Sequence, residues 1–311
     1  MREISADALR RALPHADLVD RLEADFRAGC TVPLRHHHTV DVPGGSDATL
    51  LLMPAWRSGE HIGIKLVTVF PDNGAQGLPA VMASYLLLDG TTGETLALID
   101  GGELTLRRTA CASALASRYL SRADSARLLM VGTGKLAPHL VRAHVSQRPL
   151  SYVAVWGRDP QKAAAVASEL RDEGIAATAT ADLEAAAAEA DVISCATLAS
   201  EPLIHGAWLR PGQHLDLVGG FTPAMREADD EAVQKCRVYV DTREGACQEA
   251  GDIVQPLQNG TLTEAGIAGD LFELTRGESA GRGGDDEITF FKSVGTALED
   301  LSAAGLAYER A

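Results

Sequence analysis

The chain has 311 residues, of which 46% are hydrophobic, and carries a formal net charge of −15 at pH 7. That length suggests about two domains of roughly 150 residues each. The acidic balance gives no sign of the basic face that a nucleic-acid partner requires.

The first third predicts two kinds of structure. Residues 4–28 read as helices, because apolar residues recur there at helical spacing. From about residue 31 to 100, short apolar runs alternate with turn residues, and the turns "PDNG" and "DGTTGE" are typical of antiparallel hairpins. An alanine-rich helix is expected from Leu104 to Leu120.

The pattern of predicted secondary structure changes near Arg127, from where apolar strands alternate with helices. Strands are expected at 127–131, 151–157, 191–197, 214–220 and 237–241, with helices at 135–147, 161–174, 182–190 and 226–236. Such alternation predicts a doubly wound parallel sheet. After a loop of glycines and charges at 277–287 come one more strand and a long closing helix.

The domain organisation follows from this change of pattern. We predict an α/β chain in which a Rossmann domain, residues 121–292, is inserted into an α+β domain made of residues 1–120 and 293–311.

Cysteine usage and the N-terminus favour a cytoplasmic protein. An odd number of widely spaced cysteines without CxxC argues for reduced thiols; they are Cys30, Cys111, Cys195, Cys236 and Cys247. The N-terminus lacks the apolar core of a signal peptide. No stretch approaches the roughly 20 apolar residues of a membrane span, so no membrane partner is expected.

A glycine turn of the form G-x-G-x-x-A follows the strand at 127–131. Gly132 permits a tight turn, Gly134 lets a pyrophosphate approach the backbone, and the small Ala137 lets helix and strand pack closely. Thr133 and Leu136 belong to the same turn, where the helix start faces the phosphates. Since the motif follows a strand and opens a helix, it predicts a dinucleotide site.

The end of the next strand bears on cofactor choice. An NAD site usually has an acidic residue there, whereas this strand continues "VWGRDPQKA". Arg158 is expected where a 2′-phosphate would lie, and Lys162 follows one helical turn further on. Asp159 comes one residue after the position at which an NAD site usually has its acidic residue. We therefore expect NADPH, with NADH possible, since a guanidinium binds phosphate oxygens well.

Three longer stretches, with the glycine turn and residues 289–301, resemble the ornithine cyclodeaminase/mu-crystallin family. The stretches are "GIKLVTVFPDN" (63–73), "LLLDGTTGETLALIDGGELTLRRTACASALAS" (86–117) and "DLVGGFTPAMREADDEAVQKCRVYVDTREGACQEAGDI" (216–253). The resemblance covers nearly the whole chain. It implies an inserted Rossmann domain and a homodimer, with both chain ends forming the substrate-binding and dimerisation domain.

The resemblance also implies a cationic pocket for the substrate carboxylate, formed by Arg35, Lys65 and Arg108. The residues agree with this, because Lys65 interrupts an apolar run and a buried lysine is costly unless paired. Arg108 opens a helix of small residues, where a positive charge opposes the helix dipole unless an anion is present. The ordinary alternatives are a strand-edge lysine and a salt-bridged arginine, and we interpret Arg107 as a solvated charge.

Further cofactor contacts are implied by the resemblance and by position at strand ends. They are Thr109, Thr197, Val218, Gly219, Gly220, Ser293, Val294 and Gly295. Small residues at strand ends also simply make turns.

Phe221 bears on the chemistry. In the cyclodeaminases of the family that the chain resembles, the position matching Phe221 is an aspartate, which assists deamination and ring closure of ornithine. Phenylalanine cannot transfer protons. Cyclodeamination is therefore disfavoured, and the reductase branch of the family lacks that aspartate too.

The triple histidine His36–His38 raises the question of a metal. No Cys or His lies at a zinc-like spacing from it, so no metal site is predicted. His36, next to Arg35, is instead a candidate proton source, with a polar strand residue as the alternative.

These observations predict an NAD(P)H-dependent reductase of a small cyclic ketimine carboxylate. The resemblance suggests Δ1-pyrroline-2-carboxylate and Δ1-piperideine-2-carboxylate, giving L-proline and L-pipecolate. The alternatives are a dehydrogenase of open-chain amino acids such as alanine, an ornithine cyclodeaminase, and a non-catalytic NADPH- or ligand-binding protein of mu-crystallin type.

Overall fold

The computed structural model describes all of residues 1–311, and the chain forms two compact units. Unit 1 comprises Met1–Arg108 and Thr296–Ala311, and unit 2 comprises Thr109–Gly295. The limit at Arg108 lies within helix α3 (Gly101–Leu120), ahead of the residue 120 expected from the sequence. None of the helices combines the length and apolar character that crossing a membrane requires.

Unit 1 is built on a six-stranded sheet with the strand order β1-β6-β5-β4-β3-β2. Neighbouring strands are antiparallel, except that β1 pairs parallel with β6. The strands are β1 (Arg2–Ile4), β2 (His36–Val40), β3 (Ala48–Arg57), β4 (His61–Val69), β5 (Val81–Asp89) and β6 (Thr95–Asp100). The short helix η1 (Pro71–Gln76) links β4 to β5, where the "PDNG" turn was expected.

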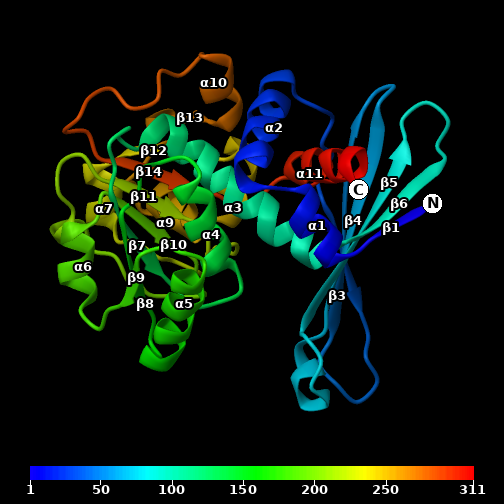
Figure 1. The fold of residues 1–311 in the computed structure, drawn as a ribbon, viewed down its shortest axis with the longest axis horizontal. Helices are drawn as coiled ribbons and strands as arrows, with labels where there is room; N and C mark the ends of the chain where they lie inside the picture. The colour runs from blue at the N-terminus through cyan, green and yellow to red at the C-terminus, as the bar shows by residue number, and fades with distance from the viewer. The chain divides into compact units, whose positions relative to one another are not determined.

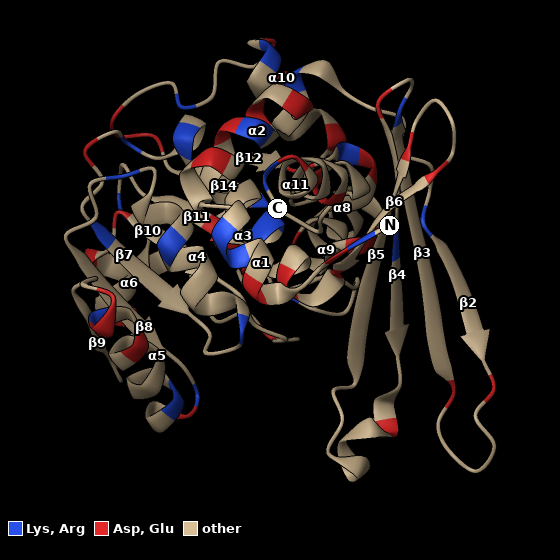
Figure 2. Cartoon of the chain, turned by 45° about the vertical axis from the view of Figure 1, so that its right-hand side comes forward, with Lys and Arg blue, Asp and Glu red and all other residues tan.

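Helices α1 (Ala6–Ala12), α2 (His15–Ala28) and α11 (Ala297–Arg310) complete unit 1. α11 packs on β3, β4 and β5 and against α2. Alternate strand residues are accordingly buried, including Lys65 and Tyr85, which are cross-strand partners. Leu66 and Met82 project from the other face and are 41% and 43% exposed. Figure 2 shows β3, β4 and β5 almost free of charged residues, and apolar side chains such as Leu66 and Met82 are exposed on the uncovered face.

Unit 2 contains eight parallel strands in the order β13-β12-β14-β11-β10-β7-β8-β9, with helices along the sheet (Figure 1). The strands are β7 (Arg127–Val131), β8 (Tyr152–Trp156), β9 (Ala177–Ala179), β10 (Val192–Cys195), β11 (His214–Leu217), β12 (Arg237–Val240), β13 (Ile267–Asp270) and β14 (Thr289–Lys292). From β7 the chain runs outward to β8 and β9, then returns to β10 on the other side of β7. This reversal is the switch point of a Rossmann sheet, and the predicted fold class is confirmed.

The helices of unit 2 follow the strands in sequence. They are α4 (Leu136–Val145), α5 (Pro160–Asp172), α6 (Leu183–Glu189), α7 (Asp230–Lys235), α8 (Arg243–Glu249), α9 (Gly251–Asn259) and α10 (Leu271–Arg276), with the short helices η2 (Gly206–Trp208) and η3 (Glu264–Gly266). On one face of the sheet, alternate strand residues such as Leu129, Ile193 and Phe290 pack with residues of α6 to α9 in one apolar core.

Candidate active site

The glycine turn after β7 has the geometry that a dinucleotide requires. Gly132 has φ +124°, and a Cβ there would lie 2.6 Å from the Ala196 carbonyl oxygen, so only glycine fits. A Cβ on Gly134 would meet no atom within 4 Å. No protein contact therefore requires the second glycine, and it leaves open the space that a pyrophosphate would occupy. Ala137 is fully buried in α4, as close helix–strand packing requires.

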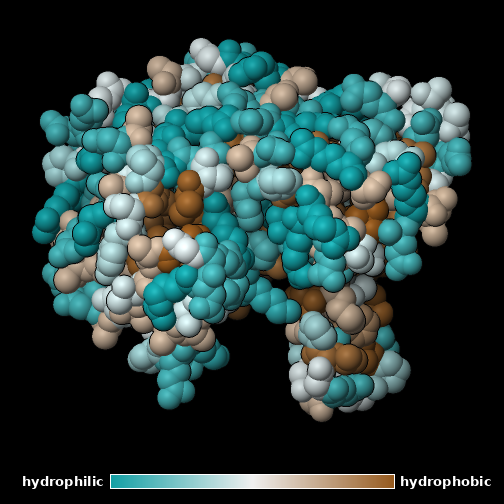
Figure 3. All heavy atoms as spheres, in the orientation of Figure 1, coloured by the Kyte–Doolittle hydropathy of each residue, from teal (hydrophilic) through white to brown (hydrophobic).

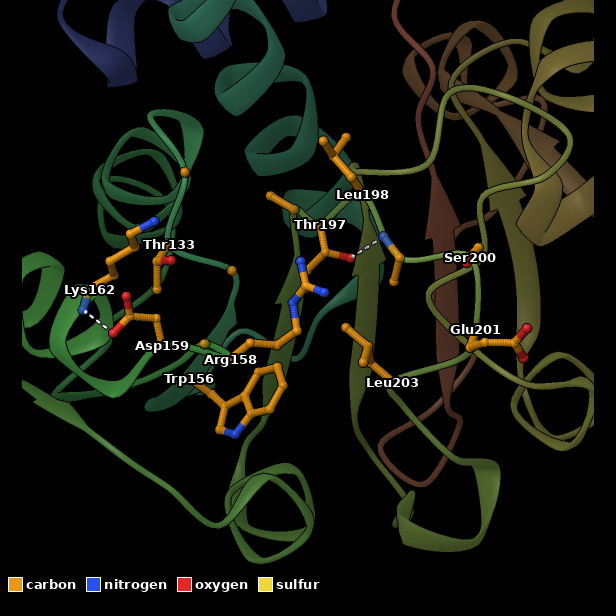
Figure 4. Close-up of a pocket in the computed structure, with 15 residues that line it drawn as sticks. Thr133, Trp156, Arg158, Asp159, Lys162, Thr197, Leu198, Ser200, Glu201 and Leu203 are labelled. Atoms are coloured by element: carbon orange, nitrogen blue, oxygen red, sulfur yellow. Dashed lines mark hydrogen bonds between the residues drawn. The ribbon is translucent and has the colours of Figure 1, made fainter. Parts of the chain in front are cut away.

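A pocket of about 630 Å³ opens beside this turn, between the ends of β7, β8 and β10 (Figure 4). Six of the predicted cofactor residues line it: Gly132, Thr133, Gly134, Arg158, Lys162 and Thr197. Leu136 and Ala137 lie in α4 and do not line it. Gly157, which the sequence reasoning missed, passes so close to Thr133 that a Cβ would lie 2.5 Å from Thr133 Cγ2.

Arg158 is exposed and extends from the end of β8 into this pocket (Figure 4). Asp159 is the N-cap of α5, where its Oδ1 accepts hydrogen bonds from the backbone N–H groups of Gln161 and Lys162 at 2.9 and 3.4 Å. Because Asp159 serves the helix start, its side chain is less suited to binding ribose hydroxyls. The positive charge that the pocket offers at this edge comes from Arg158 and Lys162.

Thr197 and Gly219 are joined by Glu227, a residue that the sequence reasoning missed. Glu227 Oε1 accepts from the Thr197 backbone N–H and hydroxyl, both at 2.7 Å, and Oε2 accepts from the Gly219 N–H at 2.9 Å. A Cβ on Gly219 would lie 2.1 Å from the Thr197 carbonyl oxygen. Packing between the two turns therefore explains Gly219, and neither Val218, Gly219 nor Gly220 lines the pocket.

The turn Ser293–Gly295 is organised by Asp241, also missed from the sequence. Asp241 Oδ2 accepts from the N–H groups of Val294 and Gly295 at 2.8 and 2.6 Å and from the Ser293 hydroxyl at 3.1 Å. Burial raises the pKa of the Asp241 carboxyl, and these hydrogen bonds oppose that effect. The turn does not line the pocket.

In unit 1 the structure brings Lys65 and Arg108 together through Asp300 of α11. Lys65 Nζ lies 2.7 Å from Asp300 Oδ2, and Arg108 Nε donates to Asp300 Oδ1 at 3.0 Å. Arg108 Nη1 also donates to Glu299 Oε2 at 2.6 Å. Lys65 and Arg108 are 2% and 5% exposed, and both acids are fully buried. The charges balance in pairs, and sequence reasoning identified the two cations but missed both acids.

These ion pairs use only part of the donor capacity of the two cations. An ammonium has three N–H donors and a guanidinium five. Burial, with Arg108 nearby, lowers the pKa of Lys65 to about 8, although Asp300 and Glu299 raise it. Lys65 is therefore mostly charged at neutral pH and loses its proton in mildly alkaline solution.

The other residues predicted for the carboxylate pocket lie elsewhere in unit 1. Arg35 is half-buried and immediately precedes β2. His36 is exposed in β2 and pairs with Leu52, which in turn pairs with Leu66. Because side chains alternate along strands, His36 projects from the sheet face opposite Lys65. The structure thus does not bring His36 to Lys65 within one chain.

Arg107 and Thr109 flank Arg108 in α3. The interpretation of Arg107 as a solvated charge is wrong: it is 8% exposed and donates to Glu103 Oε1 at 2.8 Å and to the Leu13 carbonyl at 2.6 Å. Its role in the structure is to tie α3 to the end of α1. Thr109 is half-buried and does not line the pocket.

The parallel sheet, the glycine turn and the adjoining pocket define an α/β protein of the dinucleotide-binding class. The model of the ornithine cyclodeaminase/mu-crystallin family matches residues 5–311. The chain belongs to that family, and the resemblance inferred from the sequence is confirmed.

Relatives and solved structures of this family cover the chain closely. The Δ1-pyrroline-2-carboxylate reductase of Paracoccus denitrificans is 40% identical over 92% of this chain and 90% of its own. The structure of Thermococcus litoralis Δ1-pyrroline-2-carboxylate reductase with NADH and L-proline matches with a TM-score of 0.91 and 34% identity, covering 100% of this chain and 97% of that one. An archaeal alanine dehydrogenase dimer with bound NAD gives a TM-score of 0.90 at 27% identity, over 100% and 95% of the two chains.

Proposed function

We propose that this chain is an NAD(P)H-dependent reductase of cyclic ketimine carboxylates, converting Δ1-pyrroline-2-carboxylate to L-proline and Δ1-piperideine-2-carboxylate to L-pipecolate. The observation that carries the proposal is the buried pair Lys65 and Arg108, held on one carboxylate in a chain that also has a dinucleotide site. Relatives named for the pyrroline reaction support the substrate class.

In the proposed mechanism, Lys65 and Arg108 bind the substrate carboxylate with the N–H donors that are not engaged by Asp300 and Glu299. Asp300 and Glu299 hold the two cationic side chains in place, so substrate binding costs little of their conformational entropy. The glycine turn at Gly132 and Gly134 would hold the dinucleotide, which when bound would supply the hydride for the imine carbon. With that hydride and one proton taken up at the imine nitrogen, the ring would become the saturated amine.

Lys65 is also the proposed source of that proton. Its ammonium carries a proton at Nζ at neutral pH, and a pKa near 8 makes the group acidic enough to share it. The iminium form accepts a hydride more readily than the neutral imine does.

NADPH is the proposed preferred cofactor, because Arg158 and Lys162 place positive charge at the end of β8. The relatives solved with cofactor contain NADH or NAD, which supports a nicotinamide dinucleotide in general. The cofactor comparison must therefore be made on this chain itself.

A homodimer through the sheet of unit 1 is the proposed assembly. The uncovered sheet face carries large exposed apolar residues, among them Val40, Leu66, Met82 and Leu98. Figure 3 shows hydrophobic atoms gathered over the part of unit 1 that carries η1 and the adjoining strand ends. Apolar patches of this kind mark interfaces between proteins.

Alanine dehydrogenase activity is the second candidate, because the archaeal alanine dehydrogenase has nearly the same fold over the whole chain. A panel of cyclic imines, and of pyruvate with ammonia, assayed with NADPH and NADH, distinguishes the two. The proposal expects turnover of five- and six-membered imine carboxylates and little of pyruvate. Faster turnover of pyruvate with ammonia would overturn it in favour of the second candidate.

A further inference from the structure

Unit 2 contains a second buried charge cluster, formed by Lys292, Asp252 and Glu227. Lys292 Nζ lies 3.1 Å from Asp252 Oδ2 and 4.0 Å from Glu227 Oε2, and all three residues are fully buried. Lys292 is the last residue of β14, and Asp252 lies in the first turn of α9. Burying charged groups costs free energy, and in some proteins such groups serve to hold one particular arrangement of the chain. The contacts of Lys292, Asp252 and Glu227 show which segments this cluster holds together.

Glu227 ties together the turns that follow β10 and β11. One carboxylate accepts from both donors of Thr197 and from the Gly219 N–H, so it bridges the two strand ends. The segment carrying Glu227 is itself held, because Asp252 Oδ1 accepts from the N–H groups of Glu227 and Ala228 at 2.8 and 3.1 Å.

Lys292 lies against the second of these turns. A Cβ on Gly220 would lie 3.3 Å from Lys292 Nζ and 3.2 Å from Asp252 Oδ2, so the turn passes directly over the ion pair. The ammonium thus packs against the turn at Gly219 and Gly220. It also balances the negative charge of Asp252 and Glu227, which hold this turn in place.

These two turns lie on the nicotinamide side of the switch point. At the proposed cofactor site, the glycine turn after β7 would hold the pyrophosphate, and Arg158 at the end of β8 would lie on the adenosine side. The other half of the dinucleotide must then extend over the ends of β10 and β11. Thr197 lines the pocket there.

We propose that Lys292 is a positioning residue for hydride transfer, which acts through Asp252 and Glu227 to hold the turns at Thr197 and Gly219 rigidly beneath the nicotinamide. The inference rests on the proposed use of a nicotinamide cofactor, and it holds whichever imine is reduced.

The positive charge of Lys292 favours the ionised form of Glu227, although the net effect of the surroundings is to raise the pKa of this carboxyl. Burial and the nearby Asp252 raise the pKa of Glu227, while Lys292 and the bonds from Thr197 lower it. The Cys195 thiol at the end of β10 interacts with the same groups, and its own pKa is raised by burial, so it stays neutral. A protonated Glu227 would accept these hydrogen bonds more weakly, because the negative charge that strengthens them would be gone.

The test is Lys292→Met, compared with Lys235→Met as a matched control. Lys235 belongs to α7, is partly exposed, and pairs with Glu231 away from the pocket. Lys292→Met should leave the NADH dissociation constant within about threefold of native and lower kcat by about 10- to 100-fold, as small misplacements do. Lys235→Met should change neither. Equal losses in cofactor binding and kcat, or an unchanged kcat, would overturn the proposal.

The pH profile of kcat separates positioning from general damage. Lys292→Met should move the acid limb to higher pH, because Glu227 loses its neighbouring cation. Asp252→Asn retains the Oδ1 acceptor and removes a like charge, so it should move the limb to lower pH. Shifts in the same direction, or none, would contradict the proposed role.

A readout without turnover keeps the inference separate from the proposed reaction. The fluorescence lifetime of bound NADH reports how firmly the dihydronicotinamide is held. Lys292→Met should shorten it, whereas Lys235→Met should not. If native protein reduces no imine, the proposed function fails, and the lifetime still decides this inference: an unchanged lifetime would overturn it.

Discussion

Lys65 shows how one residue can be both buried and reactive. Asp300 balances its charge at 2.7 Å, yet burial still lowers its pKa to about 8. Arg108 differs, since Asp300 and Glu299 hold its pKa above the ordinary value and it stays charged throughout. The pair therefore combines a permanent cation for the carboxylate with a cation that titrates near physiological pH.

This difference predicts a basic limb in the pH profile. Because the lowered pKa removes the Lys65 charge as pH rises, kcat/KM for the imine should fall above about pH 8. Lys65→Arg keeps the charge but cannot give up a proton, so kcat/KM should be lower while the limb moves upward by at least about one pH unit. Steady-state kinetics from pH 6 to 10 test this. An identical limb in both proteins would assign it to the substrate instead.

Arg158 makes a prediction about cofactor choice. Arg158→Ala should raise the NADPH Michaelis constant by about tenfold or more, equivalent to roughly 1.5 kcal/mol for a lost charge-assisted contact. NADH, without the 2′-phosphate, should be nearly unaffected. Arg210→Ala removes another exposed arginine, outside the pocket, and serves as the control. Equal effects of Arg158→Ala on both cofactors would show that Arg158 does not recognise the phosphate.

At the scale of residues, the sequence predicts cations more readily than their acids. Lys65 is conspicuous because it interrupts an apolar strand, and Lys292 in "TFFKSV" carries the same signal. Glu299 and Asp300 carry none, because acids in the first turn of a helix ordinarily face solvent. Only the packing of α11 on the sheet shows that they are buried.

Among the elements, β11 carries a polar network on the sheet face opposite the apolar core. Asp216 Oδ2 accepts from the Ser194 hydroxyl at 2.6 Å and lies 3.2 Å from His144 Nε2, while His214 Nδ1 lies 2.9 Å from Thr289 Oγ1. All are fully buried. Burial lowers the pKa of His214 to about 3, so the ring is neutral in the folded state.

This network makes unit 2 sensitive to acid. The pKa of His214 is lower when folded than its ordinary 6.5, so the unfolded state binds more protons between those values and stability falls as pH falls below 6.5. From pH 6.5 to 5 the loss should be about 2 kcal/mol. The lowered pKa of Asp216 acts only below its ordinary 3.8, outside this range.

Urea unfolding at pH 7 and 5 measures the effect, with His214→Asn as the comparison. Asparagine can still donate to Thr289 and does not titrate, so the variant should lose most of the difference between the two pH values. A difference of native size in the variant would mean that another group is responsible.

Elements with strong periodicity were predicted, and the shortest strands were not. Strands β7, β8 and β11 and helices α3 and α5 lie where apolar spacing placed them, and β3 and β4 fall within the stretch 31–100 in which short apolar runs were expected. The three-residue strands β1 and β9 are too short for alternation to show. The stretch from α8 to α10 went unassigned, although its helices, six to nine residues long, are about as long as the predicted α6 and α7.

For the whole molecule, the change near residue 127 from strands joined by hairpin turns to strands alternating with helices was enough to predict a Rossmann sheet within another fold. The order of the last strands was beyond the sequence, since β14 inserts between β11 and β12 by pairing that local patterns do not encode. That pairing places Lys292 beneath the turn after β11, which is why its contacts with Asp252 and Glu227 could not be foreseen.

The proposed dimer predicts a mass of twice 32.8 kDa in sedimentation equilibrium at micromolar concentration. Leu66→Asp places a charge on the uncovered face of the sheet and should yield monomers. Since Leu66 is 41% exposed in the single chain, the substitution should leave the fold of unit 1 intact, as circular dichroism can verify. A native mass near 32.8 kDa would refute the assembly.

The most direct test of imine reduction by this chain compares two reactions of the purified protein. With NADPH and Δ1-pyrroline-2-carboxylate it should form one L-proline for each NADPH oxidised, and with ornithine and NAD it should release no ammonia, because Phe221 offers no carboxylate. Lys65→Met should lose about 30- to 1,000-fold in kcat/KM for the imine while still binding NADPH, because a buried charge contact is worth roughly 2–4 kcal/mol. Ammonia released from ornithine, or proline formed by Lys65→Met at the native rate, would contradict the account.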